Sequence, residues 1–108
     1  MVVPAVGVDI ESVARFEQAN PRLFTSAEIE HSGGRAQSLA GIWCAKEAVV
    51  KAVCRWQEIH VRNVEVGHDG DRPVVVIPGF EIDVSISHTD DYAVAVAIAL
   101  PHSDPAIR

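Results

Sequence analysis

The chain has 108 residues, of which 48% are hydrophobic, and its formal net charge at pH 7 is −6. This length suits one compact domain and leaves no room for two. The acidic charge argues against a nucleic acid as the main partner, because phosphate backbones require a basic surface. No long uninterrupted apolar run predicts a membrane span. A chain this small buries proportionally little surface, so self-association is expected.

The first third of the chain predicts a strand and two short helices. Val2–Asp9 is apolar, lacks a basic region and ends on an acid, which favours a buried strand over a signal peptide. Apolar residues at helical spacing predict a helix over Ile10–Ala19. Thr25 followed by Glu28 is typical of a capping box, and the helix that it begins is expected to end near Ser32–Gly34.

The segment Gln37–Arg55 contains no proline and predicts the longest helix. Its large apolar residues form one stripe: Leu39, Ile42, Trp43, Val49, Val50 and Val53. The opposite side is small and apolar, so the helix is expected to be buried. Cys44 and Cys54 would lie about 15 Å apart on such a helix, too far for a disulfide. Both are predicted to be free core thiols in a reducing compartment, the cytoplasm.

The rest of the chain predicts strands over Val61–Val66, Arg72–Ile77, Ile82–Ser87 and Tyr92–Leu100. The sequence His68-Asp69-Gly70-Asp71 between the first two is typical of a hairpin turn. Alternation along Ile82–Ser87 predicts one buried face. Tyr92–Leu100 alternates alanine with valine or isoleucine, as a strand covered on both faces would. Residues 1–100 are therefore predicted to form one α+β domain, a mainly antiparallel sheet packed on a long helix, with a tail over 101–108.

Three acidic and basic side chains suggest where chemistry occurs. Glu47 and Lys51 are four residues apart and project from the same edge of an otherwise apolar helix. They could form only a surface ion pair, or the acid could hold Mg²⁺ while the amine meets phosphate oxygens. Asp9, at the end of the first strand, is the candidate second metal ligand, although such a residue is more often only a strand-end acid or a helix N-cap.

Two further features leave alternatives open. Lys46 lies within the apolar stripe, where its amine could extend to water, which is slightly favoured, or reach a subunit boundary or a phosphate. Ser87 and His88 end a strand, where ligands are often held, although a lone histidine is more commonly structural. The remaining histidines show no metal-ligand spacing, so zinc is not expected.

Three segments in this order resemble the signatures of the phosphopantetheinyl transferases, and the small size resembles the holo-acyl-carrier-protein synthase subfamily in particular. They are Gly7-Val8-Asp9-Ile10-Glu11 with Arg15, Trp43-Cys44-Ala45-Lys46-Glu47-Ala48-Val49-Val50-Lys51-Ala52, and Val84-Ser85-Ile86-Ser87-His88-Thr89-Asp90-Asp91-Tyr92-Ala93. The resemblance extends from about Gly7 to Leu100. It implies Mg²⁺-dependent transfer of 4′-phosphopantetheine from coenzyme A to a serine of an acyl carrier protein, by a homotrimer with active sites at the subunit boundaries.

The resemblance also implies roles for individual residues. Asp9 and Glu47 would bind the metal, and Lys51, with Lys46, would contact coenzyme A phosphates. Ser87 and His88 would contact the nucleotide end of coenzyme A from the neighbouring subunit. Arg15 and Arg22 would meet acidic residues of the carrier protein.

The chain departs from the family pattern at two places. Ile42 stands where the family often has an arginine, and Val53–Gln57 replaces a loop that usually contains glycine. Both changes bear on the affinity for coenzyme A more than on the reaction. They motivate one alternative, a weakened or inactive homologue that only binds the carrier or coenzyme A. A third reading is a structural trimer whose helix charges are only interface salt bridges.

Overall fold

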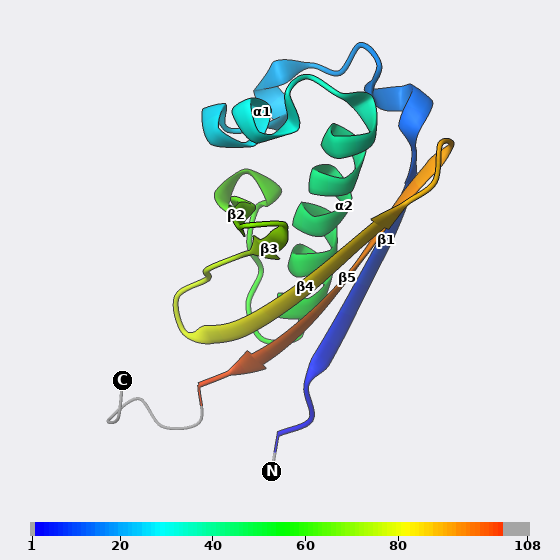
Figure 1. Ribbon diagram of the computed structural model, residues 1–108. Helices are drawn as coiled ribbons and strands as arrows, with labels where there is room; N and C mark the ends of the chain where they lie inside the picture. The colour runs from blue at the N-terminus through cyan, green and yellow to red at the C-terminus, as the bar shows by residue number, and fades with distance from the viewer. Residues whose placement is uncertain (1, 103–108) are drawn as a thin grey trace.

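A three-stranded antiparallel sheet with one long helix on one face forms the body of the protein, as the computed structural model shows for residues 2–102 (Figure 1). The elements are β1 (Ala5–Ser12), η1 (Val13–Phe16), η2 (Pro21–Leu23), α1 (Ser26–Ser32), α2 (Ala36–Val53), η3 (Val61–Asn63), β2 (Gly67–Asp69), β3 (Arg72–Val74), β4 (Phe80–His88) and β5 (Tyr92–Pro101), where η denotes a short 3₁₀ helix. The predicted α+β class is confirmed. Over residues 2–102, no helix is long and apolar enough to cross a membrane.

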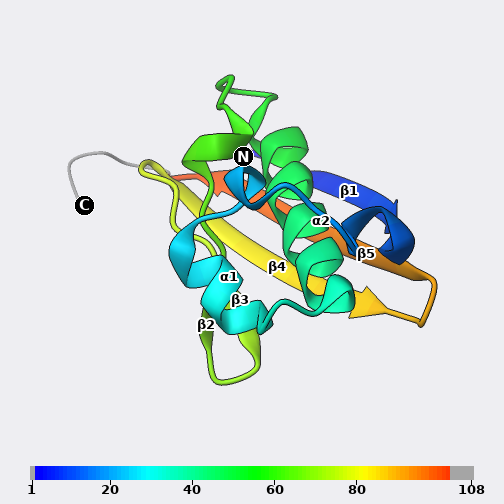
Figure 2. The same ribbon diagram turned by 90° about the horizontal axis from the view of Figure 1, so that it is seen from above.

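The sheet has the strand order β1-β5-β4, so the first and last strands of the chain are neighbours. Its register places Asp9, Ala95 and Ile86 in one row across the three strands. Helix α2 packs on β1 and β5 and more lightly on β4. Helix α1 and the separate hairpin β2–β3 lie on the same side of the sheet as α2 (Figures 1 and 2).

Small residues allow α2 to lie directly against the sheet. A Cβ atom on Gly7 would fall 2.0 Å from the carbonyl oxygen of Ala48, so only glycine permits this approach. The alanines of β5 that face α2 are all buried: Ala93, Ala95, Ala97 and Ala99. Close packing at this seam fixes how β1 and α2 sit relative to each other, and hence how their side chains meet.

The outer face of the sheet is apolar and exposed in the single chain. It is formed by Val6, Val8, Ile10, Val96 and Ile98, each at least 40% exposed. The prediction that Tyr92–Leu100 is covered on both faces is therefore wrong for one chain. Alanines pack against the helix, whereas the larger β-branched residues point outward. Such a face is typical of an interaction site.

Four other predictions need adjustment. The helix predicted over Ile10–Ala19 is wrong: β1 continues to Ser12, because these residues pair with β5, and only η1 follows. Val61–Val66 forms no strand, since His60 caps η3 by accepting from the Arg62 N–H at 3.1 Å. The hairpin begins later, at Gly67, and its first strand, β2, extends into the predicted turn as far as Asp69. Strand β5 includes Pro101, where the tail was predicted to begin, and residues 103–108 of that tail lie outside the described residues.

The predicted capping box is confirmed. The Thr25 hydroxyl accepts from the Glu28 N–H at 3.2 Å, and Glu28 Oε1 accepts from the Thr25 N–H at 2.8 Å. Helix α1 ends at Gly33, whose φ of 60° is in the left-handed region that glycine favours. Two short local signals thus define both ends of this helix.

Candidate active site

Asp9 and Lys51 meet at the exposed edge of β1. The Lys51 Nζ donates to Asp9 Oδ1 at 3.1 Å and to the carbonyl oxygen of Val8 at 2.9 Å. The Val8 oxygen is available because β1 is an edge strand. The ion pair considered between Glu47 and Lys51 is therefore not the one that forms, since the amine turns to β1 instead.

Glu47 faces the same edge, from the next turn of α2. Its pKa is raised above the usual 4.5, first by partial burial and then by the negative charge of Asp9. Lys51 lowers the pKa and Glu11 raises it further. Carboxylates from β1 and α2 therefore converge, as predicted. Glu11 was not predicted as part of this cluster, although it lies two residues after Asp9 and so shares its face of the strand.

The donor set suits magnesium better than a metal that needs a full protein cage. Asp9 Oδ2 is buried and has no hydrogen-bond partner, so one carboxylate oxygen is left without compensation. Within residues 2–102, no group of three or more His, Cys, Asp or Glu side chains could hold a metal by itself. Magnesium commonly takes only one or two protein carboxylates and completes its octahedron with water and phosphate oxygens. Asp9 and Glu47 fit that requirement.

The two predicted core thiols differ. Cys44 is free and buried beside the acids, where burial, followed by the charges of Asp9 and Glu11, raises its pKa to about 12. Its thiol donates to the Ala93 oxygen at 3.4 Å. Cys54 is free but exposed, so its predicted core position is wrong: α2 ends at Val53, and the chain turns outward there.

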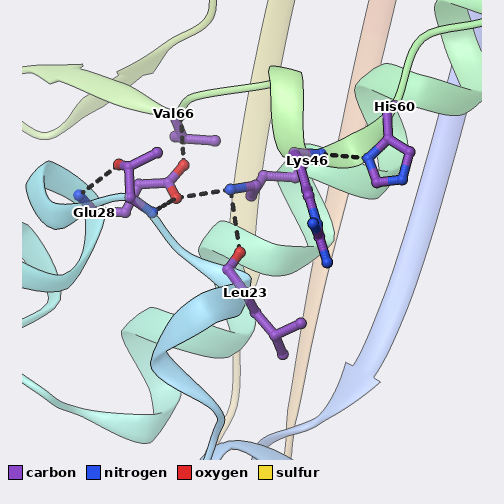
Figure 3. A network of polar contacts seen from close by, with 7 residues as sticks. Leu23, Glu28, Lys46, His60 and Val66 are labelled. Atoms are coloured by element: carbon purple, nitrogen blue, oxygen red, sulfur yellow. Dashed lines mark hydrogen bonds and ion pairs between the residues drawn. The ribbon is translucent and has the colours of Figure 1, made fainter.

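The interpretation of Lys46 as a side chain that reaches water or a phosphate is wrong. Lys46 is 1% exposed, and its Nζ donates to Glu28 Oε1 at 2.8 Å and to the Leu23 oxygen at 3.3 Å (Figure 3). The other Glu28 oxygen accepts from the Val66 N–H at 2.8 Å. Both partners are satisfied inside the protein, so this amine is not available to coenzyme A.

His88 lies on the helix-covered face of the sheet, on the far side of α2 from Asp9, whereas Ser87, one residue earlier on β4, points to the opposite face. His88 lines a hollow of about 220 Å³ with residues of the first turns of α2, among them Gly41 and Ile42. It shares a row of the sheet with Glu11, but β5 lies between them and α2 covers that face. One chain therefore does not bring these two residues to the acidic cluster.

The two arginines predicted to contact a carrier are both exposed. Arg15 forms an ion pair with Glu11, which places a cation beside the acidic cluster. Arg22 lies on η2, where the Asn20 side chain accepts from its N–H at 3.0 Å. Only Arg15 is connected to the cluster by a contact.

The comparisons with known proteins agree with this fold. The 4′-phosphopantetheinyl transferase superfamily matches residues 5–97. The chain is 37% identical to the holo-[acyl-carrier-protein] synthase of Thermodesulfovibrio yellowstonii, covering 90% of this chain and 98% of that one. It is 36% identical to the synthase of Alkaliphilus metalliredigens, covering 91% and 99%. The chain therefore belongs to the 4′-phosphopantetheinyl transferase superfamily.

Solved structures extend the similarity. The acyl carrier protein synthase of Mycobacterium tuberculosis is 34% identical, with a TM-score of 0.77 over 91% of this chain and 97% of that one. The ACPS–CoA complex of Chronobacterium ammoniagenes is 26% identical, with a TM-score of 0.78 over 94% and 99%. The predicted subfamily, an enzyme of the holo-acyl-carrier-protein synthase type, is confirmed by these relatives.

Proposed function

We propose that this chain transfers the 4′-phosphopantetheine arm of coenzyme A to a serine hydroxyl of an apo acyl carrier protein and releases 3′,5′-ADP. The observation that supports the proposal is the convergence of Asp9 and Glu47 from β1 and α2, with one buried Asp9 oxygen unpartnered. Related synthases have been solved with coenzyme A, in Chronobacterium ammoniagenes and Bacillus anthracis.

Asp9 and Glu47 would hold a magnesium ion that, when bound, neutralises the charge developing on the departing diphosphate oxygens. Lys51 is half exposed and so can move from Asp9 to those oxygens, adding a second positive charge. In the reaction, a bond forms between the serine oxygen and the β-phosphorus, and the bond from that phosphorus to 3′,5′-ADP breaks. Glu47, with its raised pKa, is one candidate acceptor for the serine proton, and water is the other.

The proposed assembly is a homotrimer with the active site at subunit boundaries. The exposed apolar face of β1 and β5 supports self-association, since a monomer gains nothing from leaving these residues in water. A neighbouring subunit is also needed to bring Ser87 and His88 to the acidic cluster. Within one chain, α2 lies between His88 and the cluster, and Ser87 is on the opposite face of the sheet. These two residues would contact the nucleotide end of coenzyme A.

Arg15 and Arg22 are the proposed contacts for the carrier protein. Carrier proteins of this type are acidic, and this chain has a net charge of −6, so a local cationic patch is required for attraction. Arg15 is well placed, since it lies next to the proposed metal ligands through Glu11. The proposed location is the cytoplasm.

The decisive test is a carrier-loading assay. Apo acyl carrier protein is incubated with this protein, coenzyme A and Mg²⁺, and its mass is followed. The proposal expects a gain of one phosphopantetheine group, which is lost when the metal is chelated. If the carrier mass does not change while coenzyme A still raises the melting temperature, the chain is an inactive binding homologue. If coenzyme A has no effect on melting either, the structural trimer is supported.

The assembly has its own test. Ile10 is 64% exposed on the outer face, so Ile10→Glu should leave the subunit folded but convert the trimer to monomer in sedimentation. Val76→Glu is the matched control, because Val76 is 81% exposed and lies outside that face. Should Ile10→Glu remain as large as the wild type, the apolar face is not the interface.

A further inference from the structure

Arg55 extends the line of charged side chains that α2 places along the edge of β1. It lies in the turn after α2, four residues beyond Lys51, which is about one helical turn, or roughly 6 Å along the axis. Its Nη1 donates to the carbonyl oxygen of Val3 at 2.9 Å, in the same way as Lys51 Nζ donates to that of Val8. Helix and strand run in opposite directions, so the end of α2 lies beside the start of β1 (Figure 1). Glu47, Lys51 and Arg55 therefore follow one edge of the sheet.

Arg55 is the cation of this edge that has no acidic partner. The other two cations have one each: Arg15 pairs with Glu11, and Lys51 pairs with Asp9. Within residues 2–102, no carboxylate forms an ion pair with Arg55, although the whole chain has a net charge of −6. The residue is exposed, and among the described residues its guanidinium donates only to the backbone oxygen. Its other N–H groups are therefore available to an anion.

The position of the guanidinium is restricted by an aromatic side chain. Arg55 Cζ lies 5.3 Å from the centroid of the Trp56 ring, and that ring packs 5.9 Å from the ring of Phe80 on β4. A guanidinium that is held in this way loses less conformational entropy when it binds a ligand. Arg55 also falls within Val53–Gln57, the segment that departs from the family pattern, so the resemblance assigns it no role.

The proposed function indicates which anion this is, and the inference rests on it. In phosphoryl transfer the attacking and leaving oxygens are roughly in line, on opposite sides of the reacting phosphorus. The proposed carrier contact Arg15 is in η1, which follows the end of β1, whereas Arg55 lies at the start of β1, with Asp9 between them. A carrier serine that approaches from the side of η1 therefore displaces 3′,5′-ADP toward Arg55.

We propose that Arg55 binds the 5′-phosphate of the departing 3′,5′-ADP. When the bond from the β-phosphorus to the bridging oxygen breaks, its electron pair stays on that oxygen, so the 5′-phosphate gains one negative charge. The guanidinium forms two parallel hydrogen bonds to phosphate oxygens more readily than an ammonium does, and its positive charge offsets the charge that develops. Lys51 and Arg55 would thus contact successive phosphates of coenzyme A from successive turns of the chain.

The experiment measures the Kd of 3′,5′-ADP by calorimetry with Mg²⁺, for the full chain and for Arg55→Met. Methionine keeps apolar contact with Trp56 but removes the charge, so the Kd should rise by about tenfold. The Kd of 5′-AMP, which lacks the 3′-phosphate, should rise by the same factor, because the contact is to the 5′-phosphate. Arg55→Lys keeps the charge without the planar fork and should recover part of the affinity. In carrier loading, kcat/KM for coenzyme A should fall by about tenfold in Arg55→Met, while KM for the carrier stays unchanged.

The matched control is Arg62→Met, the same change at an exposed arginine of η3, which should alter neither Kd. An unchanged Kd of 3′,5′-ADP in Arg55→Met would overturn the inference, as would an equal loss in Arg62→Met. A loss for 3′,5′-ADP but not for 5′-AMP would place the contact at the 3′-phosphate, and a rise in the carrier KM alone would make Arg55 a carrier contact; either result also overturns it. If the wild type leaves the carrier unloaded, the proposed function fails and the inference fails with it. A loaded carrier with an unchanged Kd contradicts the inference alone.

Discussion

Helix α2 carries two lysines five residues apart, and each pairs with a carboxylate from another element in very different surroundings. Lys46 and Glu28 are 2.8 Å apart, with side chains 2% and 0% exposed. Lys51 and Asp9 are 3.1 Å apart, with side chains 51% and 14% exposed. In the buried pair every carboxylate oxygen has a partner, whereas in the edge pair Asp9 Oδ2 has none. The first pair is complete as a structural contact, and the second is left open to a ligand.

Breaking the buried pair should give the largest effect. Lys46→Met leaves Glu28 as a buried carboxylate without its cation, which should cost about 3–5 kcal/mol of unfolding free energy. Urea denaturation measures it. Lys46→Met/Glu28→Gln should recover part of the loss, since the amide can keep the Thr25 contact without burying a charge. A cost below about 1 kcal/mol for the single change would contradict the structural role of this pair.

Removing the charge of Asp9 should affect the reaction rather than the fold. Asp9→Asn keeps the shape but loses one proposed magnesium ligand, so kcat should fall by about 10²–10³-fold, while unfolding free energy changes by less than about 1 kcal/mol. Carrier loading under saturating coenzyme A gives kcat, and urea denaturation checks the fold. Asp83→Asn, at an exposed position of β4, is the control for a lost carboxylate. A variant with near wild-type kcat would remove Asp9 from the metal site.

Lys51→Met sharpens the comparison with Lys46, because the same chemical change is made on the same helix. Half the Lys51 side chain is in solvent, so the loss of its ion pair should cost less than about 1 kcal/mol. The value of kcat/KM for coenzyme A should fall by about ten- to a hundredfold, since a charge-assisted contact to the diphosphate is lost. Lys51→Arg should retain part of the activity. An activity loss no larger than that of an exposed control such as Arg72→Met would assign Lys51 a structural role only.

The sequence was sufficient to predict the contacts that depend on short-range patterns. The capping box at Thr25, the long buried helix and the strand pattern of Ile82–Ser87 all follow from spacing. Asp9 and Glu47 were predicted together because each is a carboxylate next to apolar surroundings, one at the end of a strand and one on an apolar helix. A negative charge in such a place needs a cation. The role of Lys46 was missed, since its partner Glu28 had already been used locally as a cap. Nothing in the spacing indicates that one carboxylate serves both purposes.

Long-range pairing also explains the errors in secondary structure. Helical spacing was found over Ile10–Ala19, but the backbone of its first residues, Ile10–Ser12, pairs with β5, and these long-range hydrogen bonds override the local preference. In the same way, the outward face of β5 could not be assigned from its alternation, because alternation indicates two distinct faces but not whether another chain covers one. The pairing of Lys51 with Val8 and Asp9 depended on α2 crossing the sheet at Gly7, which only the folded structure reveals.

The smallest expected effect separates stability from activity at Glu47. The pKa of Glu47 in the folded protein is raised above 4.5, so the fold favours the protonated carboxyl. Protonated Glu47 therefore stabilises the fold below pH 4.5, and this contribution to the unfolding free energy is lost as the pH rises through the raised pKa. Near neutral pH, ionised Glu47 faces Asp9 and Glu11 and destabilises the fold. Glu47→Gln should therefore be inactive in carrier loading yet melt a few degrees higher at about pH 7 with metal chelated, the gain being limited by solvent screening. Near pH 4 the two proteins should melt together. The control Glu81→Gln, at an exposed position, should show no such difference in melting temperature. If Glu47→Gln is instead less stable than the wild type at neutral pH, the Glu47 carboxylate stabilises the fold and is not kept there for metal binding.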